Sequence, residues 1–583
     1  MQSLLCFRRR LWTLFGLLPL LTATGIQAQG TIGDSNIRTY TIGGTIGIQG
    51  HGYTTTRDFN RRAPLGALTT VNLNYSLLGF QSGLNIRYST DDNQFRQSMN
   101  EISFSGSWRW ISLTAGDVSP SHARYGLSGT SFRGGRLELT PGAVSFDLAA
   151  GRVNRAVRGS RPQDLREPAY ERWIYAGKIG FGKPGTSYFN LSTLYGKDSA
   201  GSVDFQDDTV ETAPVTRPRP TPAENLALTP DFQISLFQRA FKIGAQTTFS
   251  AYTRDTGSKA LDLGEIGIPS FISGIYTPRS SSRISFAGTA TTELDIEPFQ
   301  LRVGYERIQP GFETMGLRQV RDDNQTWNIQ PRVSFLENRI ALDGSYRFGN
   351  DNLLGNRLIT QNRQDISVNV RSMISSSFSL GLGYSNFLNK TETSGSGEGL
   401  PEGGQQQSSQ VFQVMPTYTL MGTTTSHSFS LAGIYQTLDA RFPSAYGAGS
   451  STSSTINSML NHSVSFQNGF SVNSGITYMK GEASGADFDA WGINAGTGYA
   501  FFERKLNVSA NFSVSQNSFS RPAGDQIFTN KSRQLNANIN ASYRITPTNN
   551  LRFNLRTLNN SLLEGAGQSF SELEARIQID HRF

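Results

Sequence analysis

The sequence has a single cysteine, Cys6, among its 583 residues. This cysteine precedes the apolar part of the N-terminal segment, so the chain that follows has no thiol. Disulfides, thiolate metal sites and cysteine nucleophiles are therefore excluded from the rest of the chain. A chain of this length without disulfides needs a large hydrogen-bonded framework for its stability.

Charged residues and histidines are also sparse. Only 17% of the residues are charged, and the five histidines are scattered, without the spacing of a zinc site. No local pattern indicates a Ser–His–Asp arrangement, and two Asp-Asp-Asn stretches lack the glycine and glutamate of a calcium-binding loop. We therefore predict no catalytic residues, no metal site and no cofactor. The histidines are His51, His122, His427, His462 and His581.

A long apolar run occurs only near the N-terminus. Three consecutive arginines at 8–10 precede an apolar run at 11–21, and small residues follow as far as Ala28. This order is typical of a secretory signal peptide, and the run is shorter than the about 20 residues that a membrane helix needs. We predict a signal peptide at 1–28 and Sec-type export. Removing its three arginines lowers the formal net charge from +8 to +5, which is too mild to indicate nucleic acid as a partner.

Apolar and polar residues alternate through most of the remaining chain. In "KLNVSANFSVSQ", for example, Leu506, Val508 and Ala510 alternate with asparagine and serine. Alternation of period two is typical of strands with one apolar and one polar face. Because the two faces cancel in any window, the mean hydropathy of −0.35 does not exclude a membrane protein.

The length of the alternating segments separates two all-β architectures. Strands of soluble sandwiches usually have about 5 to 6 residues, whereas a transmembrane β-strand needs about 9 to 11. The alternating segments here run for roughly 10 to 14 residues, and their polar faces carry Asn, Arg, Gln, Glu, Ser and Gly, as expected of a membrane barrel with a wet lumen.

Short turns alternate with longer polar stretches along the chain. Short turns are expected, among others, at Gln81–Gly83, Ser105–Trp108, Pro141–Gly142 and Phe502–Arg504. The alternation predicts one large antiparallel transmembrane β-barrel of about 26 strands (range about 22 to 28), without a separate plug or periplasmic domain. The predicted organisation is a signal peptide at 1–28, a short segment at 29–35 and a barrel at 36–583, with its longest extracellular loop at 198–230.

The chain ends in a two-faced strand, "SELEARIQIDHRF", that closes on an aromatic residue. This ending resembles the aromatic-terminated last strand of bacterial outer-membrane β-barrel proteins. The resemblance implies the outer membrane of a Gram-negative-type cell, surrounding lipid, and recognition by the barrel-assembly machinery. An unpaired strand edge is not tolerated in lipid, so the last strand should pair with the first, near 38–50. The residues that carry this signal are Leu573, Ala575, Ile577, Ile579 and Phe583.

A stretch at 114–142 concentrates glycine and charge. It resembles the glycine-aspartate to arginine-glycine region of fimbrial usher barrels and large protein-export barrels. The other interpretation is a bulged or closely packed strand pair, in which glycine admits backbone or loop contact. The plug domain and periplasmic modules of ushers have no counterpart in this sequence, which leaves a role in secretion open. The residues concerned are Gly116, Asp117, Arg133, Gly134 and Gly135.

Porins of 16 to 18 strands already hold an aqueous channel, so an open barrel of about 26 strands would make the outer membrane leaky. We therefore expect a segment that narrows the lumen. The long loop at 198–230 contains "PVTRPRPTP", whose extended backbone would present Arg217 and Arg219 on a stiff rod. This loop is predicted to be either a gate or an ordinary surface loop.

Several arginines fall on the polar faces of the predicted strands. A cationic lumen would favour anionic solutes. Alternatively, these arginines pair with lumen carboxylates such as Glu306, Glu572, Glu574 and Asp580, which would stiffen the wall without selectivity. The candidate selectivity residues are Arg87, Arg302, Arg332, Arg371, Arg552, Arg556 and Arg576.

Two functions fit these predictions. The first is a wide channel that passes solutes or a polymer across the outer membrane. The second is a structural or interaction barrel with a filled lumen, whose loops bind an unidentified surface or periplasmic partner. The occupancy of the lumen distinguishes them, and the sequence does not show it.

Overall fold

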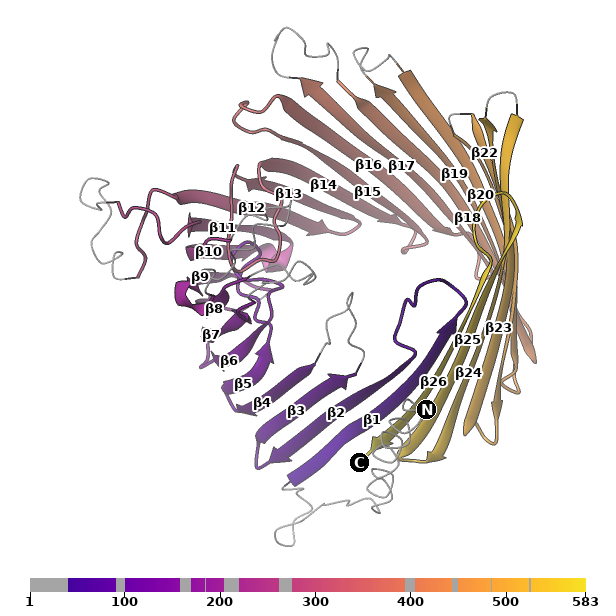
Figure 1. The fold of residues 1–583 in the computed structure, drawn as a ribbon, viewed down its shortest axis with the longest axis horizontal. Coiled ribbons are helices and arrows are strands. Elements are labelled where there is room, and N and C mark those ends of the chain that lie inside the picture. Colours follow the sequence, from indigo (N-terminus) through magenta and orange to yellow (C-terminus); the bar gives the residue numbers. More distant parts are fainter. Residues whose placement is uncertain are drawn as a thin grey trace, which may run out of the picture.

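The computed structural model describes residues 40–90, 100–157, 169–183, 185–203, 220–261, 275–393, 404–442, 449–483, 485–523 and 526–583. Its 26 strands form one antiparallel sheet that closes on itself (Figure 1). The predicted all-β barrel is confirmed. The signal peptide at 1–28 and the segment at 29–35 lie outside the described residues. Within the described ranges, no helix is long and apolar enough to cross a membrane.

The strands follow one another around the barrel in chain order. The first thirteen are β1 (Tyr40–Thr55), β2 (Leu65–Leu77), β3 (Phe80–Ser89), β4 (Glu101–Trp108), β5 (Ile111–Val118), β6 (Phe132–Leu139), β7 (Val144–Asn154), β8 (Glu171–Gly182), β9 (Tyr188–Ser199), β10 (Glu224–Leu236), β11 (Phe241–Thr253), β12 (Ser282–Ile296) and β13 (Phe299–Ile308). The others are β14 (Asn324–Phe335), β15 (Ile340–Asp351), β16 (Ile359–Met373), β17 (Phe378–Thr393), β18 (Gln406–Met421), β19 (Thr425–Phe442), β20 (Gly449–Phe466), β21 (Ser471–Ala483), β22 (Ala486–Phe501), β23 (Leu506–Ala523), β24 (Gln526–Thr546), β25 (Asn549–Glu564) and β26 (Phe570–Arg582). Two 3-10 turns, η2 (Ala200–Ser202) and η3 (Phe237–Arg239), follow β9 and β10.

The first and last strands close the barrel. β1 pairs with β26 in antiparallel register, from Thr45 opposite Arg582 to Thr55 opposite Glu572. Beyond this ladder, the backbone N–H of Phe583 donates to the carbonyl of Gly44 over 3.2 Å, and the Gly44 N–H donates to the Phe583 carbonyl over 3.0 Å. The terminal aromatic residue is thus held by the first strand, and the closed sheet has no free edge in this region.

The alternating strands give the barrel an apolar outer face. On β26, the side chains of Leu573 and Ile577 are 43% and 52% exposed, whereas Glu574, one position away, is 8% exposed and forms ion pairs inside the barrel. Exposed large apolar side chains of this kind occur on the outer face of most strands. A closed sheet with an apolar exterior and a polar interior is what a bilayer requires.

Most of the short turns lie where alternation places them, but two are displaced. Pro141–Gly142 and Phe502–Arg504 connect neighbouring strands as expected. Gln81–Gly83, however, lies inside β3, because the chain reverses at Leu78 and Gly79, whose φ angles are 48° and 86°. Two successive positive φ angles are those of a two-residue hairpin turn, and glycine adopts them readily.

The second displaced turn and the long loop also differ from the expectation. Ser105–Trp108 is the end of β4, and the chain reverses at Arg109 and Trp110. The predicted loop at 198–230 is shorter, because β10 already begins at Glu224. Residues 224–230 pair with β9, so the proline at 230 lies within a strand.

The strands differ greatly in length around the barrel. β4, β5 and β6 have 8 residues each, whereas β19, β20 and β23 have 18 and β24 has 21. Crossing the bilayer needs about 9 to 11 residues. The long strands therefore continue well beyond the hydrocarbon region at the ends away from the short turns.

The two faces of β23 give a direct test of this orientation. Phe512 lies on the outer face, 50% exposed and near the middle of the bilayer span, and Ser513 faces the lumen between Asn494 and Asn536. We expect Phe512→Arg to lower the free energy of unfolding by about 2–4 kcal/mol, the cost of arginine on the lipid face at mid-depth. The measurement is a urea titration of the protein refolded in lipid vesicles. Ser513→Arg is the control and should have a much smaller effect; equal effects would contradict the assignment of faces.

Candidate functional site: the barrel lumen

Two connecting segments fold back into the barrel and lie against its inner wall. They are residues 119–131, between β5 and β6, and residues 309–323, between β13 and β14; we call them the inner shelf. The backbone N–H of Arg124 donates to Oε1 of Gln246 over 2.7 Å, and Gln246 is an inward-facing residue of β11. In Figure 1 these segments lie inside the ring beside β8–β13.

The two segments of the shelf hold each other although they are far apart in sequence. The Ser128 N–H and the Thr130 hydroxyl both donate to the carbonyl of Gly316, over 3.1 and 2.9 Å. The rings of Tyr125 and Phe312 meet edge to face with centroids 6.2 Å apart, and Phe312 is 1% exposed. Burial, together with the carboxylate of Glu306, raises the pKa of the Tyr125 phenol. The shelf is therefore a packed structure.

Part of the wall beneath the shelf is apolar. Ile174 of β8 and Leu194 of β9 are 0% and 2% exposed and pack in one cluster with Met315 of the shelf. In the sequence, this covered part of the wall is indicated by the run Trp173–Ala176, in which four consecutive residues are apolar. A strand covered on both faces has such a continuous run, with lipid on one face and the shelf on the other. Our sequence analysis did not use this signal and missed the shelf.

One asparagine fixes the position of the shelf on the wall. The side chain of Asn225 on β10 is 0% exposed, and its Nδ2 donates to Ser250 Oγ over 2.8 Å and to the carbonyl of Ala251 over 3.0 Å. Its Oδ1 accepts from the Thr314 hydroxyl over 3.1 Å and from the Met315 N–H over 3.0 Å. A buried amide with its donors and acceptors satisfied specifies one docking position, because any shift would leave polar groups unpaired.

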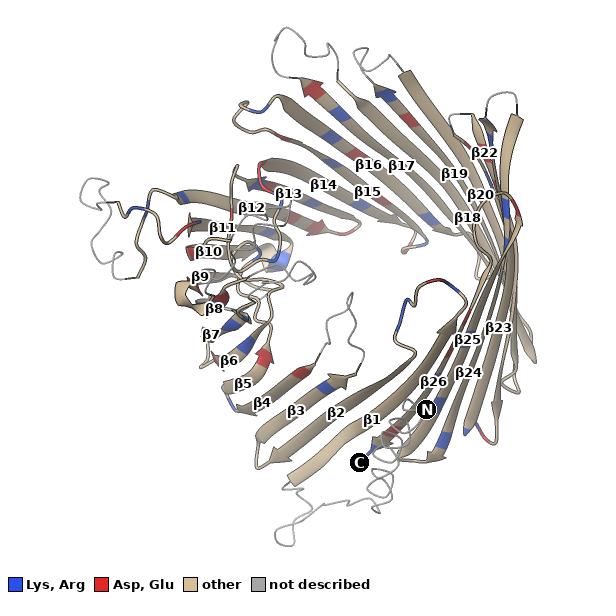
Figure 2. Ribbon diagram, viewed as in Figure 1, with Lys and Arg blue, Asp and Glu red and all other residues tan. Residues whose placement is uncertain are grey.

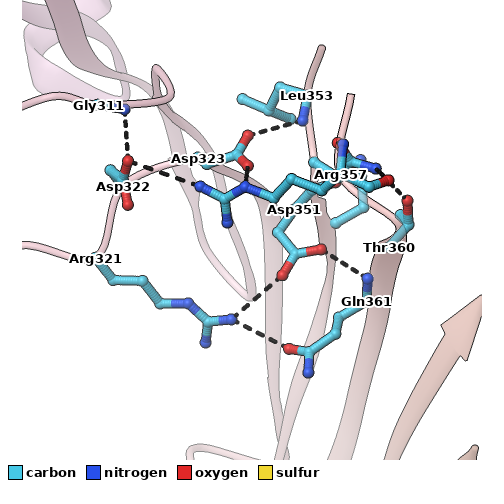
Figure 3. A network of polar contacts seen from close by, with 11 residues as sticks. Gly311, Arg321, Asp322, Asp323, Asp351, Leu353, Arg357, Thr360 and Gln361 are labelled. Carbon is cyan, nitrogen blue, oxygen red and sulfur yellow. Dashed lines mark hydrogen bonds and ion pairs between the residues drawn. The ribbon is translucent and has the colours of Figure 1, made fainter. Parts of the chain in front are cut away.

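The end of the shelf at 321–323 is tied to the hairpin at 352–358 between β15 and β16 (Figure 3). Asp323 is 1% exposed; its Oδ2 lies 2.9 Å from Nε of Arg357 and its Oδ1 accepts from the Leu353 N–H over 2.8 Å. Beside it, Arg321 lies 3.6 Å from Asp351. We call these contacts the latch.

The glycine-rich stretch begins where the shelf leaves the wall. Gly116 has a φ of 106°, and a Cβ there would lie 2.1 Å from the carbonyl oxygen of Ile102; a Cβ at Gly134 would lie 1.9 Å from that of Ala150. Neither position has room for a side chain, because neighbouring backbones approach too closely. Gly135, the neighbour of Gly134, has no contact of this kind closer than 3.6 Å.

The charged pair of that stretch joins neighbouring strands. Asp117 and Arg133 are opposite each other on β5 and β6 and share two hydrogen bonds, of 3.1 and 2.9 Å. Asp117 also accepts from the backbone N–H of Ile102 over 2.8 Å. These contacts pin the start of the shelf to three strands, and a role of the stretch in protein export stays a prediction.

Most of the candidate lumen arginines lie beside carboxylates. Five of the seven form ion pairs with inward-facing Asp or Glu, and within the described ranges Arg87 and Arg556 have none. The pairs are Arg302–Glu293, Arg332–Asp343 (3.4 Å), Arg371–Asp343 (3.1 Å), Arg552–Asp580 (3.5 Å) and Arg576–Glu574 (2.6 Å). Glu306 and Glu572 pair instead with Arg124 and Arg57, both at 2.6 Å. Selectivity for anions stays a prediction, and the pairing weakens the field on which it depends.

The predicted gate residues, Arg217 and Arg219, lie outside the described residues. Their role as a gate stays a prediction, and among the described residues the shelf is a connecting element that lies inside the barrel.

No protein-family model matches the chain, and a search of curated proteins found no match. Among solved structures, the chain is similar to the translocation pore of the P pilus usher PapC, with 10% identity over 93% of this chain and 99% of that chain and a TM-score of 0.34. It is also similar to OccAB2 of Acinetobacter baumannii, with 12% identity over 62% of this chain and 92% of that chain and a TM-score of 0.29. For the outer membrane protein OpdK of Pseudomonas aeruginosa, the identity is 10% over 62% of this chain and 94% of that chain, with a TM-score of 0.28. With identities and TM-scores this low, no function is transferred from these structures.

The latch can be tested without knowledge of function. We expect Arg357→Ala to loosen the shelf, because it leaves the buried carboxylate of Asp323 without its cation. Since Arg357 itself is half exposed, the cost is smaller than that of breaking a fully buried ion pair. Trypsin should then cleave after Arg318 and Arg321 about tenfold faster or more, because cleavage follows the population of the open segment. Mass spectrometry of the fragments of the folded protein measures this rate. Arg332→Ala serves as the control, because Arg332 is about as exposed as Arg357 but its partner Asp343 is 25% exposed, whereas Asp323 is 1% exposed. Equal rates in both variants would contradict the latch.

Proposed function

We propose that this protein is a channel of the outer membrane, through which solutes or a polymer cross, and not an enzyme. One observation carries the proposal: inward-facing arginines of the wall are exposed to solvent. The side chains of Arg302, Arg332, Arg371 and Arg552 are 59%, 53%, 72% and 57% exposed, although each points into the barrel. In a lumen filled by side chains and loops, these groups would be buried. Their exposure therefore supports a water-containing path.

The size of the barrel supports the same proposal. Barrel diameter grows roughly linearly with strand number, and porins with 16 to 18 strands already leave an aqueous channel. With 26 strands, the barrel is wider. The described shelf contacts the wall from β7 to β13 and leaves the wall from β18 to β26 free of shelf contacts among the described residues.

The proposal includes the location of the protein, the outer membrane. The apolar outer face and the aromatic last residue support insertion by the barrel-assembly machinery into the outer membrane of a Gram-negative-type cell, after Sec-type export. A partner at the surface or in the periplasm is compatible with this function, because the long strands project beyond the bilayer.

Conductance of the purified, refolded protein in a planar bilayer tests the channel. We expect large, steady current steps with only weak preference between anions and cations, because most lumen arginines are paired. Asymmetric salt gives the permeability ratio. Silent bilayers, with insertion shown independently by protection of the strands from protease, would contradict the channel and favour the interaction barrel.

A further inference from the structure

The lumen wall away from the shelf carries almost no charge. Among the charged residues of β18–β24, only Arg521 and Arg544 face inward. Each lies near the C-terminal end of its strand, so in these antiparallel strands they are at opposite ends of the barrel. The ribbon is mostly uncharged there in Figure 2. The other charged residues of these strands face outward, toward the C-terminal ends of β19 and β21 and the N-terminal ends of β22 and β24: Asp439, Arg441, Lys480, Glu482, Asp487, Asp489, Lys531 and Arg533.

Asparagines occupy this wall in rows. In one row Asn494 of β22 lies opposite Ser513, which lies opposite Asn536. Two residues further along the strands, Asn511 lies opposite Asn538. Such rows are separated by about 6.8 Å along the strands and about 4.8 Å between strands. We call these inward-facing side chains the amide panel: Asn473, Asn494, Asn511, Asn536, Asn538, Asn540 and Asn554.

Glycines between the asparagines keep the amides flat against the wall. A Cβ at Gly496 would lie 2.2 Å from Oδ1 of Asn511 and 2.5 Å from Oδ1 of Asn473. A Cβ at Gly475 would likewise lie 2.5 Å from the Oδ1 atom of Asn494 and from that of Asn461. Amides from both neighbouring strands thus lie across each glycine, where any side chain would displace them.

The panel lines two hollows in the wall. One, of about 530 Å³, includes Asn540 and Asn554 with Arg552 and Arg576 at its β25–β26 side, and the other, of about 470 Å³, includes Asn511 and Asn538 with Arg556 at its β25 side. Among the described residues, no protein group hydrogen-bonds to the side chains of Asn473, Asn494, Asn511 and Asn536, so these amides are available to a solute. Each primary amide offers two donors and a carbonyl acceptor.

We infer that the amide panel is a binding surface for an uncharged, hydroxyl-rich chain, that is, a neutral glycan passing through the lumen. Hydroxyl groups both donate and accept, as amides do, so a glycan can exchange water for panel contacts at every sugar. At the asparagine rows of β21–β24 an ionic solute would lose hydration without gaining an opposite charge, because the inward arginines that border the panel, Arg552, Arg556 and Arg576, lie on β25 and β26. This inference rests on the proposed channel and names the class of its cargo.

The first test is the interruption of single-channel current by six-unit oligosaccharides. Maltohexaose and cellohexaose are the neutral probes, and a six-unit oligogalacturonate is the anionic probe. The neutral oligomers should interrupt the current in a concentration-dependent way, and the anionic one should not. In the variant Asn511→Ala/Asn538→Ala, the affinity of the neutral oligomers should fall about fivefold or more, as expected when modest hydrogen bonds are lost.

The control variant carries the same substitutions on the charged wall, Asn328→Ala/Asn369→Ala, where Asn369 faces Asp343 across the ladder. It should retain the affinity of the unmodified protein. Equal loss in both variants, stronger interruption by the anionic oligomer, or no interruption by either neutral oligomer in a conducting channel would overturn the inference and leave the channel standing.

A second measurement does not depend on conduction. Calorimetric titration of the folded, full-length protein in detergent with maltohexaose and cellohexaose should show saturable binding that the panel variant weakens and the control variant keeps. If bilayers are silent and this pattern holds, the channel fails and the panel stands as a glycan-binding surface. Absence of saturable binding for both oligomers overturns the inference in either case.

Discussion

Closure of the sheet is the constraint on which the rest of the structure depends. Backbone N–H and C=O groups cannot remain unpaired in hydrocarbon, so the edge of the first strand must meet the edge of the last. The ladder between β1 and β26, continued by the reciprocal bonds of Gly44 and Phe583, satisfies this requirement. Once the wall is closed, alternation decides the direction of every side chain, and the lumen receives whatever polar residues each strand carries.

The closed wall is not uniform inside. Where the shelf docks, the strands carry apolar residues on both faces, and the buried amide of Asn225 sets the docking position. Farther around, on β14–β16, charged groups are paired with one another; β18–β24 has almost no inward charge, and paired charges return on β25 and β26. The shelf, the ion pairs and the amide panel thus occupy successive sectors of one sheet. Their different chemistry comes only from the residues at inward positions.

How much of this was predictable depends on the range of the interactions involved. Alternation and short turns are local, and they were sufficient to predict one antiparallel barrel and its number of strands. The displaced turn at Leu78 and Gly79 shows the weakness of local signals, since several nearby residues can form a turn and the hairpin geometry selects among them. The shelf depends on contacts such as that of Thr130 with Gly316, which are 186 positions apart. A local pattern cannot reveal such a contact, although the apolar run at Trp173–Ala176 indicates that something covers the strand.

The pairing of lumen charges also affects how a wide lumen selects its solutes. A wide lumen lined by free arginines would concentrate anions near the wall, and the substrate would be selected by charge. Five of the seven candidate arginines lie beside carboxylates, so the electrostatic field at the wall is small. Short-range hydrogen bonds then contribute more to the selection of solutes. Hydrogen bonds to an amide surface are individually weak, so a bound chain can exchange them one after another and move on. A surface of this kind suits passage better than tight binding, because a conducting site must hold its cargo weakly enough to release it.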